Sequence, residues 1–393
     1  MAKEDRIKII KELQAKRDSR LICYITGDRE NLGAMMSQDI VRILYDQVRL
    51  FPADSKQQLD IFLYSRGGDT NVPWQVVSMF RQVLQGANFN VLIPYRAQSA
   101  ATMLALGADN ILMGEKGELG PIDATIRGPY NPKDKATNNP LPISVEDLMG
   151  YFSLLGKFTE KLEKEDHVKA FEILAKEVHP LGLGAVKRLL EQTKSEAENL
   201  LATRNRPHMK QVNQRIVKKL SSELFSHHHA ISRKEALDDI HIKHVAPPDP
   251  NVEKLMWDLF LEYEKELQLR TPFRPEEDLI VNNLDERIYP DLKIIYVESE
   301  HRTDVFKLNI RMQKVRDIPP QLTLNPQIQL PAINLPPGVT TPQGIAQFIQ
   351  QWLQSQVPPV LQAILPQFFA QLMNSIPIKG FNRTELNRRW ETE

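Results

Sequence analysis

The sequence predicts an α/β fold built on a parallel sheet, because short apolar runs alternate with helical patterns through the first third of the chain. The strand-like runs are 21–27, 59–64 and 88–95. Alternation of this kind requires right-handed crossovers, so the strands run in one direction and their carboxyl ends share one edge of the sheet. We therefore expect the functional loops to follow the strands, where Gly67, Gly68 and Ser99 occur.

Length and composition limit the class of protein. The chain has 393 residues, of which 41% are hydrophobic and 25% charged, as in an ordinary globular protein of two domains. Fifty basic residues balance fifty acidic ones, so no overall field attracts nucleic acid. No stretch reaches the ~20 consecutive apolar residues of a membrane span, and residues 1–20 lack the apolar core of a secretory signal. We expect a cytoplasmic protein with neither a transmembrane segment nor a nucleic-acid partner.

Changes in composition divide the chain into four expected segments. They are an N-terminal helix over 1–19, a main domain over 20–245, a small α+β element over 246–316 and a tail over 317–393. Helical patterns rich in Leu, Lys and Glu dominate residues 145–225, so the main domain should carry a helical extension. Two strand-like runs, 292–299 and 305–315, define the α+β element.

The tail differs in kind from the rest of the chain. Eleven of the 27 prolines lie between positions 319 and 377, and charged residues are missing from 321 to 375. Apolar and aromatic residues recur through 345–372, which is too apolar for a solvated tail. We expect this segment to pack against the chain's own core or against a partner subunit.

A serine placed between a strand and a helix carries the main chemical signal. Ser99 opens a helix rich in small residues, so its hydroxyl should stand clear of the preceding strand. Acyl transfer also needs backbone N–H groups aimed at the developing oxyanion, and Gly67 and Gly68 can present them without a Cβ in the way. Each feature alone has an ordinary interpretation, as a helix N-cap or as a turn, so their order along the chain carries the prediction.

Five segments of the chain resemble one known family. They read LDIFLYSRGGDT at 59–70, PYRAQSAATMLALGADNILMGEKGELGPID at 94–123, LGLGAVKRLLEQTKSEAENLL at 181–201, SHHHAISRKEALDD at 226–239 and IYVESEHRTDVF at 295–306. In this order they resemble the serine dehydrogenase proteinase family of the ClpP/crotonase-like superfamily, which is related to signal peptide peptidase A. The resemblance covers residues 20 to 310.

The resemblance implies an α/β fold of the ClpP/crotonase type, that is, a spiral of ββα units with a helical extension and a C-terminal α+β element. It also implies an ATP-independent serine peptidase that forms a homo-oligomer and acts on a protein or peptide substrate. Ser99 corresponds to the nucleophile of the family. The turn of Gly67 and Gly68, together with the amide of Ala100, corresponds to the oxyanion hole.

The general base departs from the family pattern. ClpP-type peptidases have a histidine after the strand equivalent to LGPID, whereas Asp123 stands there in this chain. Relatives of signal peptide peptidase A use a downstream lysine, but residues 139–149 contain none. Lys135 is our candidate base, since a desolvated lysine can accept a proton near neutral pH. Asp123 is a candidate site residue that shapes the site or hydrogen-bonds within it.

Other chemistry-bearing residues point to ordinary roles. Cys23 is the only cysteine and lies in an apolar run, so we expect a buried thiol and no internal disulfide. The adjacent His227, His228 and His229 lack the spacing of a metal site, so we expect no metal. The absence of a P-loop or dinucleotide fingerprint predicts no cofactor.

Two alternatives stay open besides a serine peptidase. A ClpP-like scaffold or binding protein that lacks a working base would keep the fold and lose turnover. A crotonase-like acyl-CoA enzyme would use the same oxyanion geometry on thioesters, although a serine at the nucleophile position disfavours it.

Overall fold

The computed structural model describes most of the chain and divides it into two compact units. The described residues are 2–52, 58–122, 125–126, 130–134, 137–141, 143–145, 147–148, 150–151, 154, 164–224, 226, 228–316, 347–352, 354–355 and 376–393. The first unit comprises 1–273, 291–308 and 387–393, and the second comprises 274–290 and 309–386. The candidate site lies in the first unit.

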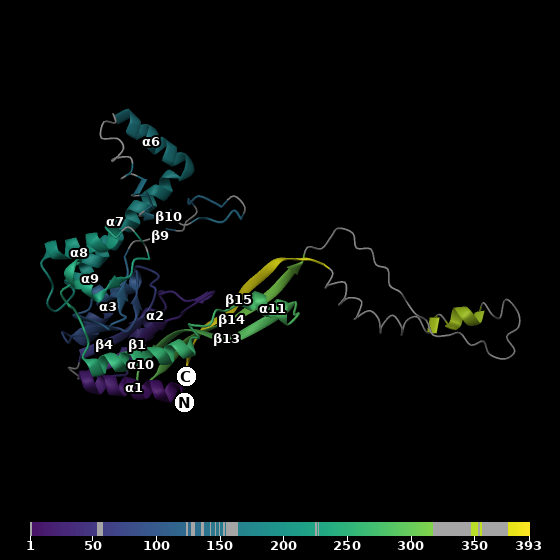
Figure 1. Cartoon of the computed structure of the whole chain (residues 1–393), viewed down its shortest axis with the longest axis horizontal. Coiled ribbons are helices and arrows are strands. Elements are labelled where there is room, and N and C mark those ends of the chain that lie inside the picture. Colours follow the sequence, from purple (N-terminus) through teal and green to yellow (C-terminus); the bar gives the residue numbers. More distant parts are fainter. Residues whose placement is uncertain are drawn as a thin grey trace. The chain divides into compact units, whose positions relative to one another are not determined.

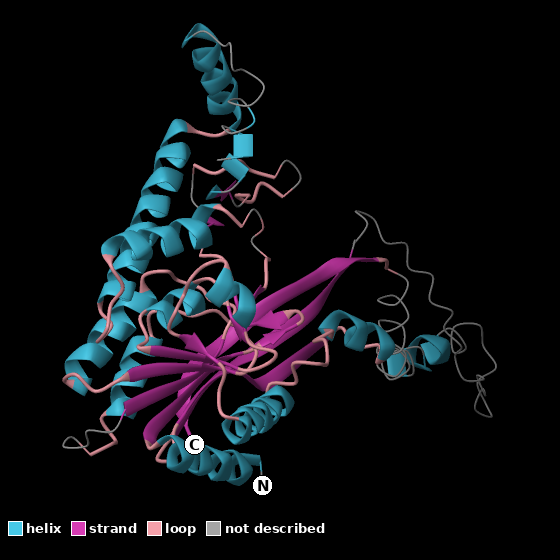
Figure 2. Ribbon diagram, turned by 60° about the vertical axis from the view of Figure 1, so that its left-hand side comes forward, coloured by secondary structure: helices cyan, strands magenta, loops and turns pink. Residues whose placement is uncertain are grey.

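Within the described residues, eight strands form the main sheet in the order β12-β7-β5-β4-β1-β13-β14-β15 (Figure 2). Its parallel part consists of β1 (Ser19–Thr26), β4 (Gln58–Tyr64), β5 (Phe89–Ile93), β7 (Asn110–Met113) and β12 (Val245–Ala246). These five strands pair in parallel with one another. Their side chains are almost all buried, as expected of a parallel sheet covered on both faces.

The other three strands are longer and include one that the sequence did not predict. They are β13 (Glu286–Glu298), β14 (Thr303–Arg316) and β15 (Ile378–Thr392). β13 pairs antiparallel with β1, with Cys23 opposite Glu298. β15 lies within the segment 317–393, which the sequence analysis treated as a tail. Its residues are mostly exposed and rich in charge, as is common on an edge strand, so no apolar alternation marked it.

Helices cover the sheet of the first unit (Figure 1). On one face, α1 (Ala2–Arg17) and α10 (Pro250–Glu266) bury their apolar sides against β1 and β4. The other helices around the parallel strands are α2 (Ile40–Val48), α3 (Val72–Leu84), α4 (Ala100–Leu106) and α7 (Pro180–Ala202). Neighbouring pairs among these four helices pack together.

The parallel strands are followed by members of a second, smaller sheet. That sheet contains β6 (Arg96–Ala97), β8 (Glu118–Leu119) and β11 (Ile231–Ser232). β5 leads to β6 and then to α4, while β4 leads to Ser65, which pairs in parallel with Ala97, and then to α3. A strand of the main sheet, a short strand and a helix thus recur along the chain. This recurrence confirms the α/β spiral of ββα units that the sequence predicted.

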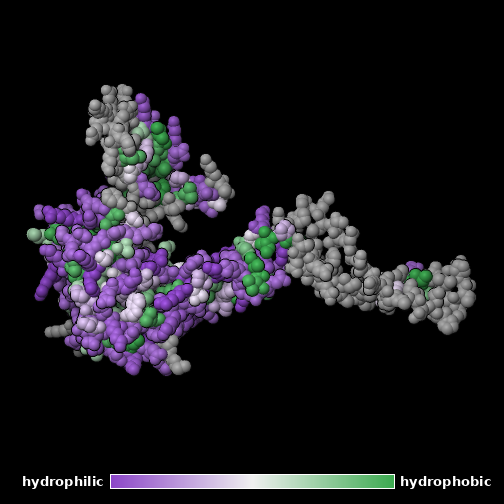
Figure 3. All heavy atoms as spheres, viewed as in Figure 1, coloured by the Kyte–Doolittle hydropathy of each residue, from purple (hydrophilic) through white to green (hydrophobic). Residues whose placement is uncertain are grey.

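The remaining elements form the helical extension, small hairpins and a short helix of the second unit. They are α6 (Lys164–Glu177), α8 (Lys210–Ser222), α9 (Arg233–Asp238), α11 (Pro275–Val281), β2 (Asp28–Arg29), β3 (Leu32–Gly33), β9 (Thr125–Ile126) and β10 (Ile143–Ser144). Apolar side chains stay exposed on α6, among them Val168, Phe171 and Ile173 (Figure 3). None of the helices described has both the length and the apolar character to cross a membrane.

A buried ion pair attaches α1 to the sheet. Arg6 donates from Nε to Glu298 Oε2 at 2.7 Å and from Nη2 to Oε1 at 3.1 Å, and both side chains are at most 1% exposed. The same carboxylate accepts bonds from Tyr263 at 2.6 Å and from Thr303 at 2.7 Å. Burial alone would lower the pKa of Arg6, but the hydrogen bond and the charge of Glu298 outweigh it and raise that pKa.

Replacing Arg6 with Met should lower the free energy of unfolding by about 3–5 kcal/mol, because Glu298 would keep a buried charge without its partner. Urea unfolding followed by circular dichroism measures this loss. Arg42→Met is the matched control, since Arg42 pairs with Asp46 on the surface of α2 and should matter little. Equal losses in the two variants would contradict an anchoring role for Arg6.

Candidate active site

The strand ladder brings two turns of the chain together. β4 and β5 pair in parallel, and the pairing continues past their ends through Ser65. The Ser65 N–H donates to the Arg96 carbonyl at 2.9 Å, and the Gln98 N–H donates to the Ser65 carbonyl at 3.0 Å. The residues that follow each strand, Gly67 and Ser99, are therefore neighbours.

Ser99 has an unusual backbone and an uncommitted side chain. Its φ of 52° lies in the left-handed region, which is uncommon for a residue with a Cβ and is found most often at functional sites. Ser99 occupies the N-cap position of α4 but makes no side-chain capping bond. The interpretation of Ser99 as an ordinary N-cap is therefore wrong, and its half-buried hydroxyl is left for other chemistry.

Gly67 contacts the serine directly. Its φ is +94°, and a Cβ at this position would lie 2.5 Å from the Gln98 carbonyl oxygen and 2.8 Å from the Ser99 Cβ. It would also lie 2.8 Å from the amide nitrogen of Ala100. Only glycine permits this approach of one turn to the other.

Gly68 is positioned by a third segment of the chain. The Met36 N–H donates to the Gly67 carbonyl at 2.8 Å, and the Asp69 N–H donates to the Met36 carbonyl at 2.9 Å. A Cβ on Gly68, whose φ is +154°, would stand 2.2 Å from the Met36 oxygen. The segment around Met36 therefore holds the turn from the side opposite Ser99.

Of the three backbone N–H groups of Gly67, Gly68 and Ala100, only that of Gly67 donates a hydrogen bond among the described residues. The Gly67 N–H donates to Ser65 Oγ at 3.0 Å, and Thr26 Oγ1 donates to the same oxygen at 2.8 Å. In contrast, the amides of Gly68 and Ala100 make no hydrogen bond within the part of the chain that the structure describes. Two amides next to Ser99 and Gly67 thus lack an acceptor among the described residues.

Thr102 ties the serine helix to its surroundings. Its buried hydroxyl oxygen lies 2.7 Å from the Ala97 carbonyl and accepts the Gly120 N–H at 3.0 Å. Sequence reasoning did not identify Thr102, Ser65 or Thr26 as supports of the site. Only Ser65 could have been found from the sequence, because it is a hydroxyl residue at the end of a predicted strand, just before Arg66 and Gly67.

A charged network braces the loops beside the site. Asp28 accepts hydrogen bonds from Tyr64 at 2.6 Å and from Arg66 at 2.7 Å, and it pairs with Arg96 at 3.0 Å. Burial alone would raise the pKa of Asp28, but the bonds from Tyr64 and Arg66 and the two arginine charges hold it below its ordinary value. Arg96 also donates to Glu118 at 3.0 Å. Arg66, next to Gly67, and Arg96, three residues before Ser99, are therefore both joined to Asp28.

The candidate base Lys135 and the candidate site residue Asp123 lie outside the described residues, as does His227. Lys133, in the same loop as Lys135, is exposed. The described members of the histidine run do not gather around a metal ion, since His228 is exposed and His229 Nε2 lies 2.7 Å from Glu235 Oε1.

Two expectations about cysteine and metal chemistry can be compared with the structure. Cys23 is buried, as predicted, and burial raises the pKa of its thiol, which leaves it unreactive. Among the residues described, no three His, Cys, Asp or Glu side chains gather in a way that suits a metal ion.

Gly67→Ala should lower the free energy of unfolding by about 2 kcal/mol or more, because the new methyl group overlaps the Gln98 carbonyl at a strained φ. Thermal and urea unfolding measure the change. Gly184→Ala in α7 is the control, since a Cβ there meets open space and should stabilise the helix by up to about 1 kcal/mol. A Gly67→Ala variant as stable as the unsubstituted chain would refute the close approach of the two turns.

The part of the chain that carries this site is similar in sequence to known proteins. Residues 1–134 match the family model described as ClpP-like SDH-type serine proteinase. Two uncharacterized proteins of Methanocaldococcus jannaschii are 30% identical over 132 residues and 28% identical over 131 residues. Each match covers 31% of this chain and 43% or 42% of the relative, so the chain spans less than half the length of these relatives.

Two solved structures show a distant likeness to this chain. ClpP1 from Listeria monocytogenes superimposes with a TM-score of 0.32 and 12% identity, over 61% of this chain and 98% of that chain. The membrane-bound stomatin-specific protease 1510-N gives a TM-score of 0.31 and 12% identity, over 55% of this chain and 76% of that chain. The family match, by contrast, rests on sequence and includes both turns of the site. Residues 1–134, which contain Gly67, Gly68 and Ser99, are thus similar in sequence to the ClpP-like SDH-type serine proteinases.

Proposed function

We propose that this protein is a serine peptidase that hydrolyses peptide bonds through an acyl-enzyme on Ser99. One observation carries the proposal: the uncapped Ser99, at a φ of 52°, lies against Gly67, and the amides of Gly68 and Ala100 have no partner among the described residues. A nucleophile and an oxyanion hole are what acyl transfer requires of a protein besides a base. The family match over residues 1–134 supports the same chemistry.

The proposed reaction uses the geometry in two steps. Ser99 Oγ attacks the carbonyl carbon of the substrate and loses its proton to the base, while the N–H groups of Gly68 and Ala100 donate to the oxyanion. The tetrahedral species then collapses, the C–N bond breaks and the amine leaves with the proton from the base. Water attacks the acyl-enzyme with the help of the same base and releases the acid.

The base belongs to the proposal as well. We assign it to Lys135, with Asp123 as a residue that shapes the site, because the resemblance to peptidases with a lysine base requires a lysine downstream of the serine. A lysine acts as a base near neutral pH only when burial or a neighbouring cation lowers its pKa. Lys133, which is exposed, does not meet this requirement, so substitutions of Lys133 and Lys135 should have different effects.

Substrate, assembly and location complete the proposal. A protein or peptide substrate follows from the family, and no nucleic-acid partner is expected from the balanced charge. The exposed apolar side chains of α6 and the apolar segment 345–372 support a homo-oligomer, because such surfaces are stable when a second copy covers them. We also propose that the protein acts in the cytoplasm.

A fluorophosphonate probe should label the full-length protein covalently, and Ser99→Ala should abolish the labelling because the attacking oxygen is gone. Intact-protein mass spectrometry measures the added mass. Ser226→Ala, which removes an exposed serine elsewhere, should label like the unsubstituted chain. Labelling that persists in Ser99→Ala would refute this nucleophile, and a folded protein that never labels would favour the scaffold alternative.

Lys135→Met should slow fluorophosphonate labelling by about 10²–10⁴-fold, the usual contribution of a general base. Lys133→Met removes an exposed lysine from the same loop and should leave the rate unchanged. The labelling rate constant of each variant, measured at equal concentration, decides between them. If both variants react as fast as the unsubstituted protein, the base is a different residue.

A further inference from the structure

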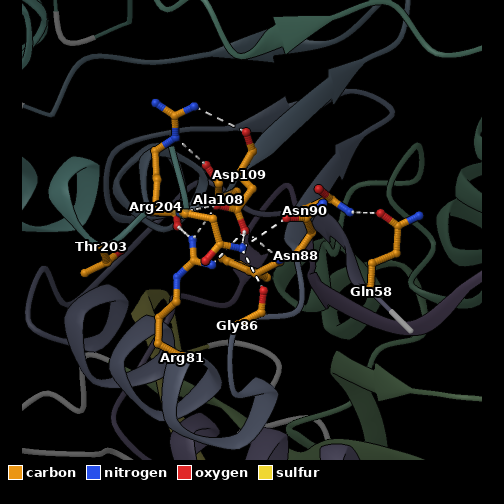
Figure 4. Close-up of polar contacts among 12 residues, drawn as sticks. Gln58, Arg81, Gly86, Asn88, Asn90, Ala108, Asp109, Thr203 and Arg204 are labelled. Atoms are coloured by element: carbon orange, nitrogen blue, oxygen red, sulfur yellow. Dashed lines mark hydrogen bonds and ion pairs between the residues drawn. The ribbon is translucent and has the colours of Figure 1, made fainter. Parts of the chain in front are cut away.

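The amino-terminal edge of the sheet, opposite the edge that carries Ser99, holds a second polar cluster. Its centre is Asp109, which directly precedes β7 (Figure 4). The Asp109 carboxylate accepts bonds from Arg81 at 2.7 Å, from the Phe89 N–H at 2.8 Å and from the Asn205 N–H at 2.7 Å. The charge of Asp109 is therefore already matched by the guanidinium of Arg81.

Arg204 lies beside this carboxylate without using it. Its side chain is only 7% exposed and donates to two main-chain carbonyls, that of Ala108 at 3.0 Å and that of Asp109 at 3.3 Å. The third nitrogen, Nη1, is buried and has no hydrogen-bond partner in the part of the chain that the structure describes. Burial is the main reason why the pKa of Arg204 falls to about 10. A buried guanidinium nitrogen without an acceptor is costly, so this arrangement favours the binding of an anion.

Two histidines complete the cluster. His244 is 7% exposed, and neither of its ring nitrogens has a hydrogen-bond partner. The ring of His208 lies 5.5 Å from that of His244, centroid to centroid, and its buried Nε2 is also unpartnered. His208 is half-buried, so the cluster reaches towards solvent on that side. Four polar atoms on three adjacent side chains thus lack partners in one place, whereas buried polar atoms are nearly always satisfied.

The charges around the histidines are positive. Burial lowers the pKa of His244 well below its ordinary value, and Arg204 and His208 lower it further. Burial also lowers the pKa of His208, and the charges of Arg204 and Lys243 lower it further. A metal ion would meet the guanidinium of Arg204 and would find two imidazoles, which is too few ligands for a structural zinc site. An anion instead gains from the same charge and from N–H donors that have no other acceptor.

We propose that Arg204, His208 and His244 bind a small oxyanion of the phosphate or sulfate class. Arg204 Nη1 and one N–H of each imidazole donate to the oxygens of the anion. Because Arg204 and His244 are more than nine-tenths buried, the cluster admits a free anion or the terminal phosphate of a larger molecule. The site lies at the sheet edge opposite Ser99, so its occupant is not the substrate of the peptidase.

Calorimetric titration of the full chain with inorganic phosphate, in chloride buffer of constant ionic strength, tests the proposal. We expect binding of one phosphate per chain and a rise in Tm that chloride does not reproduce. His208→Gln should weaken binding about tenfold, and Arg204→Gln more, because a charged hydrogen bond is lost. Arg206→Gln is the matched control, an exposed arginine of the same loop, and should bind phosphate normally.

Glycerol phosphate, titrated in parallel, separates the two sources of the anion. Binding of inorganic phosphate alone assigns the site to the free ion, and equal binding of both assigns it to a terminal phosphate group. The proposal is overturned if phosphate gives neither specific heat nor stabilisation beyond chloride, in which case ordered water satisfies these atoms. It is also overturned if Arg206→Gln weakens binding as much as His208→Gln does, since the effect would then be diffuse attraction. His208 is half-buried, so its variant keeps the test valid if Arg204→Gln does not fold.

Discussion

Parallel pairing of β4 with β5 continues beyond the strand ends through Ser65, and the position of the candidate site depends on this ladder. Because the ladder is parallel, the segments that follow β4 and β5 leave the sheet at the same edge and meet there. Gly67 then lies in van der Waals contact with Ser99, at a separation that excludes any Cβ. The hydroxyl of Ser65 accepts the Gly67 N–H, whereas the N–H of Gly68 has no acceptor among the described residues.

Both edges of the parallel sheet carry hydrogen-bond donors that lack an acceptor among the described residues. At the carboxyl edge, free N–H groups of turns and of the start of α4 accumulate beside Ser99. At the amino edge, Asp109 and Arg81 form one neutral pair, and Arg204 is left as a buried cation. One parallel sheet therefore positions Ser99 at one end and the cluster of Arg204, His208 and His244 at the other, with the buried strands between them.

The helices on the first unit's sheet are held by different forces. α10 and α1 bury apolar side chains against β1 and β4, and the Arg6–Glu298 pair fixes their register within that apolar layer. Tyr263 and Thr303 satisfy the remaining capacity of the carboxylate, which is the condition under which a buried charge is tolerated. Around Ser99, hydroxyl groups position the main chain. Ser65 accepts the Gly67 N–H and is itself bonded by Thr26, while Thr102 donates to the Ala97 carbonyl.

The sequence by itself determined the parallel strands, the helices between them and the pairing of a glycine turn with Ser99, because apolar runs and turn chemistry are local properties. It also indicated that Cys23 is buried. Only the tertiary structure decided which hydroxyls support the turn, since Thr26, Ser65 and Thr102 come from three separate elements. The sequence did not predict β15 because a charged edge strand lacks apolar alternation. It did not predict the cluster of Arg204, His208 and His244 because the spacing of these residues does not show that they are buried together.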